Sequence, residues 1–372
     1  MKTSFKRSNT VKYALIFLII LTIILMLSLR LIFVSEEAPK AEETMILVLE
    51  DCDEDNKMST APYGDTAFLM NSNFELVRKF NGLNITGAFC AHRNISVSED
   101  GRFFAVCEST PNMLAVYEMA TGRKIWSLTG IFSSPVFVNE LLYTINYESI
   151  FAIDNEGIIV KHARISAYDM TIDREHNCFW ISGRDIKKCN LDLETVLTVK
   201  YFKGLKFPLF VEVNPDGSIW IAQDAYERYG RENMLIKISP EGEVLRTINL
   251  EFTPARVCID KSDGSVWTTG MVKERDLSGI GDEMPETLDE LNEQVKTNIE
   301  TFTRKYDSDG NLIFEISEGG YAIELDPSDG SVWIADKKNL WHYSANGRNL
   351  ASYSGVSDGQ KWLAIVPCAT LK

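Results

Sequence analysis

Hydrophobic and polar positions alternate along most of the chain in short runs that end at Gly-containing turns. Three runs share one phrase, in which a tight turn precedes an aromatic, β-branched segment: PDGSIWIA at 215–222, SDGSVWTT at 262–269 and SDGSVWIAD at 328–336. Asp-Gly supplies the positive φ angles that a tight hairpin needs, and alternate side chains of the following strand point to opposite faces. The pattern predicts a repeated unit of β-sheet.

A second hairpin follows each of these phrases, at 235–248, 302–316 and 340–353, so each unit contains about four strands. Weaker copies precede them at 96–128, 150–163 and 171–201. Trp180 and Trp220 are 40 residues apart, and Trp220 and Trp267 are 47 apart. Four strands every 40 to 50 residues are typical of the blades of a β-propeller.

The two ends of the repeated region indicate how a ring would close. Met45 to Glu50 begins a unit that has no innermost strand, and Lys361 to Pro367 is a strand without a unit of its own. Pairing them would remove two open sheet edges. The sequence therefore predicts an all-β fold, a seven-bladed β-propeller over 45–372 closed by the C-terminal strand. The unit at 131–163 is thin, and merging it with a neighbour gives six blades as the alternative.

These phrases resemble those of known families. PDGSIWIA and SDGSVWIAD, each followed by a hairpin with a Gly turn, resemble the repeats of NHL-type and related propellers of six or seven blades. YEMATGRKIWSL at 117–128 is similar instead to the repeat of quinoprotein-like propellers, where a Thr-Gly turn precedes a docking Trp. The resemblance covers 45–372 and implies a propeller. Since such phrases maintain the blade, it implies no particular chemistry.

An almost wholly apolar stretch, 13–34, precedes the repeats. At about 1.5 Å per residue it is long enough to cross a hydrocarbon core of about 30 Å. Basic residues come before it (Lys2, Lys6, Arg7, Lys12) and acidic residues soon follow (Glu36, Glu37, Glu42, Glu43). The positive-inside rule predicts a cytoplasmic tail at 1–12, a transmembrane signal anchor at 13–34, a linker at 35–44 and an extracytoplasmic domain. A cleaved signal peptide, with an apolar core of about 7 to 15 residues, is the alternative.

The charge balance argues against one class of partner. The chain has 38 bases and 53 acids, and its first 35 residues hold five of the bases and none of the acids. Binding to a phosphate backbone requires clustered Lys and Arg, and no basic run interrupts the repeats. Nucleic acid is therefore not an expected partner.

Cysteines and histidines give little sign of chemistry. Seven cysteines without a CxxC motif are ordinary usage. Cys178 and Cys189 are expected nearly opposite each other in one hairpin, and Cys90 and Cys107 across a turn, so an extracytoplasmic location would permit either disulfide. The four histidines lie in different units at unrelated positions, where no metal or proton-transfer site is expected: His92, His162, His176 and His342.

Three polar residues are expected near the central channel, where the inner strands of a propeller meet. Glu212 and Glu324 occupy like places in their units, and Arg256 lies on or beside an inner strand. Such residues commonly line a wet channel. The sharper alternative is a divalent cation, calcium, held by Glu212 and Glu324 as in lactonase-like propellers.

A second candidate for calcium is the acidic run at 50–57. Asp51, Asp53 and Asp55 have the alternate spacing of a calcium loop. Asn56 stands where Gly is expected and Pro62 where the bidentate Glu should be, so a solvated loop is the preferred interpretation.

The longest departure from repetition is an insertion at about 271–300. Apolar residues at Leu288, Leu291, Val295 and Ile299 are spaced for one helical face, and this predicts a helix over Pro285 to Glu300. The insertion is expected between the second and third strands of its blade, near the channel mouth, where it would be either a binding element or a helix packed on its own blade.

Another loop on the same rim, QDAYERYGREN at 223–233, is rich in Tyr and Arg. If a ligand binds there, the residues expected near it are Asp224, Tyr226, Arg228 and Tyr229, with Arg256 beside the channel. Sequons at Asn84 and Asn94 would accept glycans if the host modifies secreted chains.

Together these features favour a binding or scaffold module, a membrane-anchored propeller that presents its rim to a protein or glycan partner, with no cofactor. The alternative is a metal-dependent, lactonase- or lyase-like hydrolase with its site in the channel. A quinone-dependent oxidoreductase is less favoured, because the docking phrase occurs once.

Overall fold

The computed structural model describes residues 44–50, 65–83, 94–109, 112–199, 208–223, 233–276, 296–336, 338–355 and 361–367. They belong to one compact unit, Thr44–Lys372. The predicted tail at 1–12, the anchor at 13–34 and most of the linker lie outside the described residues. Among the residues that are described, no helix is long and apolar enough to span a membrane.

The described chain forms seven four-stranded antiparallel sheets, which we number as blades 1 to 7 from the N-terminus. Blade 1 contains β28 (Lys361–Val366), β1 (Met45–Glu50), β2 (Asp65–Asn71) and β3 (Leu76–Leu83). Blade 2 contains β4 (Ile95–Val97), β5 (Phe103–Ser109), β6 (Asn112–Glu118) and β7 (Lys124–Thr129). Blade 3 contains β8 (Ser133–Val138), β9 (Leu141–Ile145), β10 (Ile150–Ile153) and β11 (Ile159–Ala163).

The remaining blades follow in sequence order. Blade 4 contains β12 (Asp169–Asp173), β13 (Cys178–Ser182), β14 (Ile186–Asn190) and β15 (Thr195–Val199). Blade 5 contains β16 (Pro208–Val213), β17 (Ile219–Gln223), β18 (Met234–Ile238) and β19 (Val244–Asn249). Blade 6 contains β20 (Thr253–Ile259), β21 (Val266–Asp276), β22 (Lys296–Tyr306) and β23 (Leu312–Ile316). Blade 7 contains β24 (Ala322–Leu325), β25 (Val332–Ala335), β26 (Leu340–Tyr343) and β27 (Asn349–Tyr353).

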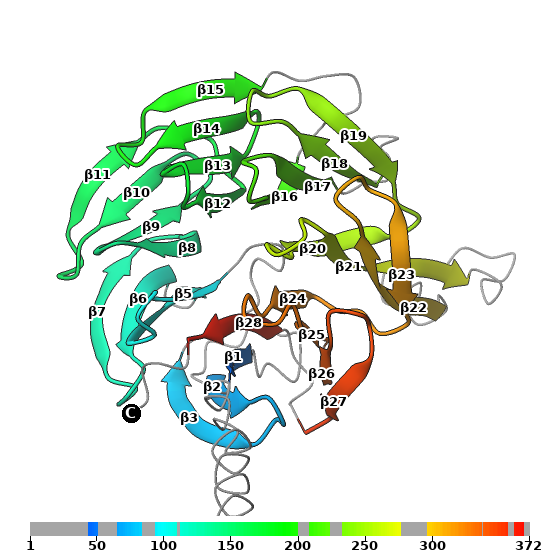
Figure 1. Cartoon of the computed structure of the whole chain (residues 1–372). Helices are drawn as coiled ribbons and strands as arrows, with labels where there is room; N and C mark the ends of the chain where they lie inside the picture. The colour runs from blue at the N-terminus through cyan, green and yellow to red at the C-terminus, as the bar shows by residue number, and fades with distance from the viewer. Residues whose placement is uncertain are drawn as a thin grey trace, which may run out of the picture. The chain divides into compact units, whose positions relative to one another are not determined.

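The first strands of the seven blades form a closed inner ring (Figure 1). Each contacts the first strand of the blade on either side, in the order β28, β4, β8, β12, β16, β20, β24 and back to β28. The protein is therefore a seven-bladed β-propeller, as predicted. The thin unit at 131–163 forms a complete blade, so the six-bladed alternative is wrong.

Blade 1 closes the ring with strands from both ends of the repeated region. β28 pairs with β1 over its whole length, from Lys361 opposite Glu50 to Val366 opposite Met45. Both strands are almost entirely buried. The predicted closure is thus confirmed: β1 is paired on both edges, and β28 becomes the innermost strand of blade 1.

The repeated phrase builds the same turn in successive blades. In blade 6 the Asp260 carboxylate accepts hydrogen bonds from the backbone N–H and the hydroxyl of Ser262, at 3.0 and 2.6 Å. Gly264 has a φ angle of 73°, a left-handed conformation that glycine adopts without steric cost. Asp326 and Ser328 repeat the arrangement in blade 7. The strand that follows this turn carries a Trp whose side chain is buried in the core.

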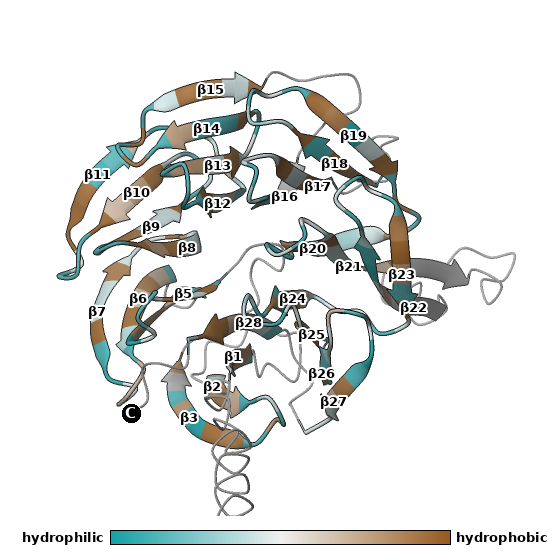
Figure 2. Ribbon diagram, in the orientation of Figure 1, coloured by the Kyte–Doolittle hydropathy of each residue, from teal (hydrophilic) through white to brown (hydrophobic). Residues whose placement is uncertain are grey.

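Four of these tryptophans are fully buried and pack against the following blade: Trp180, Trp220, Trp267 and Trp333. The second strands are rich in buried apolar residues, while the outermost strands also carry exposed apolar residues (Figure 2). Each indole buries a large area between two sheets. The core of the propeller is thus a series of interfaces between blades.

A basic side chain on the third strand lies over each of these indoles. Strand register places Lys188, Lys237, Lys305 and His342 directly opposite the four tryptophans. The three lysine ammonium groups are 5.1 to 5.8 Å from the ring centroids, a cation–π geometry. The His342 ring stacks on Trp333 with centroids 4.0 Å apart.

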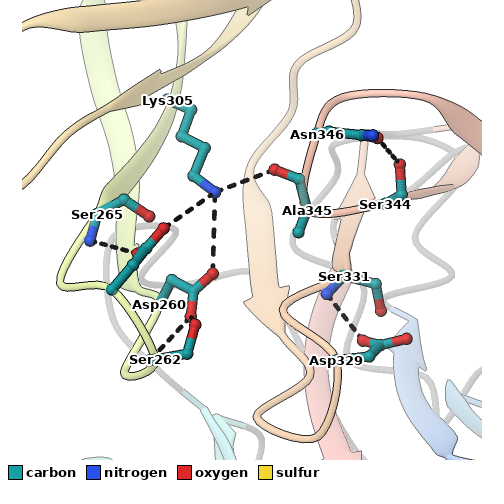
Figure 3. A network of polar contacts seen from close by, with 10 residues as sticks. Asp260, Ser262, Ser265, Lys305, Asp329, Ser331, Ser344, Ala345 and Asn346 are labelled. Carbon is teal, nitrogen blue, oxygen red and sulfur yellow. Dashed lines mark hydrogen bonds and ion pairs between the residues drawn. The ribbon is translucent and has the colours of Figure 1, made fainter.

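Two of these lysines also tie one blade to the next. The Lys237 ammonium donates to the Ser308 carbonyl of blade 6 at 2.8 Å, and the Lys305 ammonium donates to the Ala345 carbonyl of blade 7 at 3.0 Å. Figure 3 shows the second case, in which Lys305 also lies 3.8 Å from the carboxylates of Asp260 and Asp263. Both lysines therefore contact the core and the neighbouring blade, and Lys305 also contacts the turn of its own blade.

The insertion begins between the second and third strands of its blade, as predicted, but the helix is wrong at its C-terminal end. Residues 296–300 belong to β22, and β21 and β22 pair without a break from Val266 opposite Tyr306 to Asp276 opposite Lys296 (Figure 1). Alternate β-branched residues, Thr297 and Ile299, suit a strand once β21 offers a partner. Residues 277–295 lie outside the described residues.

The expected disulfide of blade 4 is not formed. Cys178 lies opposite Asn190, and Cys189 lies opposite Phe179, one position out of register. Both thiols are free and buried. Burial raises the pKa of the Cys178 thiol to about 11, which keeps it protonated. Cys107 is likewise free, and Cys90 lies outside the described residues.

We expect Lys305→Met to destabilise the propeller far more than Lys237→Met. The first change leaves Asp260, whose side chain is 5% exposed, without its cation, at a cost of about 3–5 kcal/mol. The second removes one hydrogen bond, worth about 1 kcal/mol. Urea unfolding followed by Trp fluorescence measures both, and equal losses would contradict the structural role of the Lys305 network.

We expect His342 to make the propeller less stable in mild acid. Burial is the largest influence and lowers the pKa of His342, while the Ser72 backbone and the Asp329 and Asp326 carboxylates oppose it. A histidine whose pKa is lower in the folded chain favours folding fully above its ordinary pKa of about 6.5 and loses this contribution as the pH falls. His342→Phe keeps a ring over Trp333 without the charge. Its free energy of unfolding should change less between pH 7.5 and 5 than that of the parent, and an unchanged slope would refute this.

Candidate functional site

The antiparallel blades give the propeller two distinct faces. Turns between first and second strands, and between third and fourth strands, lie on one face, which we term the turn face. Connections between second and third strands, and those between blades, lie on the other, which we term the loop face. The rim chosen from the sequence belongs to the loop face.

Four of the predicted ligand-binding residues cannot be placed. Asp224, Tyr226, Arg228 and Tyr229 lie outside the described residues, between β17 and β18. The acidic run after Glu50 and the sequon at Asn84 also lie outside them. Their roles stay predictions.

The other predicted residues do lie at the inner ring. Arg256 of β20 and Glu324 of β24 line the same small cavity, together with Asn94, Ile95 and Trp362 from blades 1 and 2. Arg256 is buried, and its guanidinium lies 4.8 Å from the centroid of the Phe210 ring. The sequon residue Asn94 is 8% exposed, so it is not a surface acceptor for a glycan.

Glu212 lies on the inner strand β16, apart from that cavity. Its carboxylate accepts a hydrogen bond from the Thr171 hydroxyl of blade 4 at 3.1 Å. Asp169, on the same inner strand as Thr171, accepts from the Ser134 hydroxyl of blade 3 at 2.7 Å and from the Val211 backbone N–H of blade 5 at 3.2 Å. These acids tie inner strands of neighbouring blades together.

The channel contains a small cavity beside Arg256 and Glu324. Its small cavity has a volume of about 10 Å³, about the space of one water molecule. Arg256 in the same cavity places a positive charge on the wall that Glu324 shares. In the described parts of the chain, no three His, Cys, Asp or Glu side chains are grouped so that they could hold a metal ion.

The three described histidines have local partners in separate blades. His162 is 3.0 Å from the Ser149 hydroxyl, and His176 is 2.8 Å from the Asp173 carboxylate. His342 is 2.9 Å from the Ser331 hydroxyl. These three partners belong to the same blade as their histidine, and the three histidines lie in three different blades.

A much larger cavity, of about 390 Å³, opens on the turn face between blades 2 and 3. Its volume lies in the range of ligand pockets. Six apolar side chains line it: Phe103, Val116, Ile125, Trp126, Phe137 and Leu142. We refer to this cavity as the blade 2–3 pocket.

The mouth of the blade 2–3 pocket is acidic. Its charged lining residues are four acids and one base: Glu99, Asp100, Glu140, Asp154 and Arg102. The first-to-second-strand turns of blades 2 and 3 carry the first three acids, and the third-to-fourth-strand turn of blade 3 carries Asp154. An apolar interior below an acidic mouth favours a ligand that is both hydrophobic and positively charged.

Arg174, from blade 4, stabilises one wall of the pocket. Its guanidinium forms an ion pair with Glu99 of blade 2 and donates to the Phe137 carbonyl of blade 3 at 3.0 Å. Arg102 lies 5.3 Å from the Phe103 ring and 3.9 Å from Asp100. Blades 2, 3 and 4 therefore hold the mouth in place together.

Sequence reasoning missed this pocket because its residues come from three turns and five strands of two blades. One signal was present. The second strand of blade 2 reads FFAVCES and has no Trp, unlike the second strands of blades 4 to 7. The second strands of blades 1 and 3, MILVLE and LLYTI, lack this Trp as well, so the signal points to blades 1 to 3 and does not by itself locate the pocket.

Comparison with known proteins supports the fold and nothing finer. No protein-family model matches the chain, and no curated protein matches it. Hydrazine synthase of Kuenenia stuttgartiensis has a similar structure, with 14% identity, a TM-score of 0.55, and coverage of 71% of this chain and 80% of its own. A functionally unknown protein from Desulfotomaculum acetoxidans DSM 771 has 11% identity, a TM-score of 0.58, and coverage of 86% and 98%.

Proposed function

We propose that this protein is a membrane-anchored, extracytoplasmic binding module that holds a partner protein on its propeller. The observation that carries the proposal is the blade 2–3 pocket, a concave and largely apolar site that is open on the turn face. A binding site of this kind needs neither a metal nor a cofactor. A protein partner is preferred to a glycan because six apolar side chains line the pocket and could receive an apolar side chain of a protein.

Anchoring rests on the apolar stretch at 13–34 and on the basic residues before it. The Gly turns and Trp strands of the blades support an NHL-like repeat as the finer description of the propeller. A tethered propeller would be held close to the membrane surface through the linker at 35–44. Its partner would then be a membrane protein or a protein of the same compartment.

We expect the full chain to stay in the membrane pellet after alkaline carbonate extraction, since an uncleaved helix cannot be washed out. Protease added to intact spheroplasts or cells should digest the propeller and leave a short fragment that begins at residue 1. A chain that shifts in size to begin near residue 35 and becomes soluble would instead show a cleaved signal peptide.

We expect site-specific photo-crosslinking in the native cells to capture a partner from the pocket side. Benzoylphenylalanine placed at Ile125, an exposed lining residue, should give one discrete adduct, because a bound partner would cover this position. Leu245 is the matched control, since it is exposed at the second position of β19 as Ile125 is in β7. Equal labelling at both positions, or none at Ile125, would contradict the proposed function.

A further inference from the structure

The blade 2–3 pocket lies at the positions that a Trp and a Lys hold in blades 4 to 6. The first turns of blades 2 and 6 close in the same way, with Ser98 N–H donating to the Phe103 carbonyl and Asp260 N–H to the Ser265 carbonyl. Two residues after each acceptor come Ala105 in blade 2 and Trp267 in blade 6. The register positions opposite them hold Val116 and Lys305, respectively.

The residues around this place also correspond. Trp126 lies opposite Val116 on the fourth strand of blade 2, as Phe314 lies opposite Lys305 in blade 6. Gly157 of blade 3 lies against Trp126, as Gly347 of blade 7 lies against Phe314. The outer frame of the interface is thus retained while its two central side chains are reduced to Ala and Val.

Part of the polar end of this place is also retained. In blade 6 the Lys305 ammonium is bound by the Ala345 carbonyl, the residue after the first position of a turn in the next blade. Asn155 holds the same position in the corresponding turn of blade 3, which Asp154 N–H closes by donating to Ile158. Asp154 and Asn155 both line the pocket. Blade 3 therefore places Asn155 where blade 7 places Ala345, whereas Ser98 of blade 2 stands where blade 6 has the Asp260 carboxylate.

The charges at the mouth of the pocket also favour a positively charged ligand. Glu140 is exposed and follows Asn139, whose φ angle is 54°, in the two-residue turn between β8 and β9. Among the described residues, no ion pair to Glu140 or Asp154 is found. Arg102 is 3.9 Å from Asp100, and Arg174 pairs with Glu99. Two acids thus remain to attract a positively charged ligand.

We propose that the blade 2–3 pocket receives a segment of the partner protein in which a Lys or Arg stands beside an aromatic residue. The aromatic ring would take the place that Trp267 holds in blade 6, and the cation would take the place of the Lys305 ammonium. This inference rests on the proposed function and names the chemistry of the partner at the same site.

The test uses the full chain in detergent and three fluorescein-labelled octapeptides of glycine and serine, with Trp-Lys, Trp-Glu or Ala-Lys at the centre. Fluorescence anisotropy should show that the Trp-Lys peptide binds at least tenfold more tightly than either of the others. Equal affinity for Trp-Glu, equal affinity for Ala-Lys, or no binding of Trp-Lys up to about 1 mM would overturn the inference.

Two variants locate the binding. Glu140→Lys should weaken the Trp-Lys peptide at least fivefold, whereas Glu241→Lys, an exposed acid in the third-to-fourth-strand turn of blade 5, should not. Equal effects of the two would show nonspecific attraction by an acidic protein and overturn the inference. The double change Ala105→Trp with Val116→Lys should fill the pocket and abolish binding. If that variant does not fold, the comparison of Glu140 with Glu241 decides.

The proposed binding function and the proposed chemistry of the partner segment can each be rejected without the other. A discrete crosslink from Ile125 combined with no preference among the peptides would leave the binding module standing and reject the Trp-Lys chemistry. Absence of the crosslink combined with selective binding of the Trp-Lys peptide would retain the pocket chemistry and reject a partner at this face in the native cells.

Discussion

The packing between blades 4 to 7 and the blades that follow them depends on buried indoles, and in blade 6 a buried cation lies over one of them. Lys305 lies over Trp267, within 4 Å of two carboxylates, and donates to a carbonyl of the next blade. The ammonium would be costly to bury by itself, but here it has acceptors on three sides. The same side chain therefore fixes the turn that starts its blade and the distance to the blade that follows.

The ring imposes a constraint that strengthens this effect. Since β28 completes blade 1, all seven interfaces must fit at once, and a poorly packed interface cannot open without straining the others. The inner strands add polar links, such as Asp169 between blades 3 and 5. Because the closed ring holds the blades in place, one interface can have small central side chains without collapsing. A preformed pocket between blades 2 and 3 requires this.

The position of the pocket between two blades of a closed ring explains why it is a better functional candidate than the channel. The channel residues Arg256, Glu212 and Glu324 lie where inner strands crowd together, and the cavity beside two of them has room for about one water molecule. The blade 2–3 pocket instead opens at the outer turns, with apolar walls and acids at its mouth. A binding module needs access from solvent and a rigid wall, and Arg174 supplies the latter by joining three blades.

The sequence by itself determined the blades, because each Asp-Gly turn and alternating strand is a local pattern whose physics acts within a few residues. It also determined the closure, since Met45 to Glu50 and Lys361 to Pro367 are strands that each need a partner. Tertiary pairing decided that residues 296–300 are strand, where β21 offered backbone partners to a segment with helical spacing. It also set the register that separates Cys178 from Cys189. The pocket could be found only in the tertiary structure, because it is the space left between two blades where Ala105 and Val116 are smaller than the corresponding Trp and Lys of blade 6.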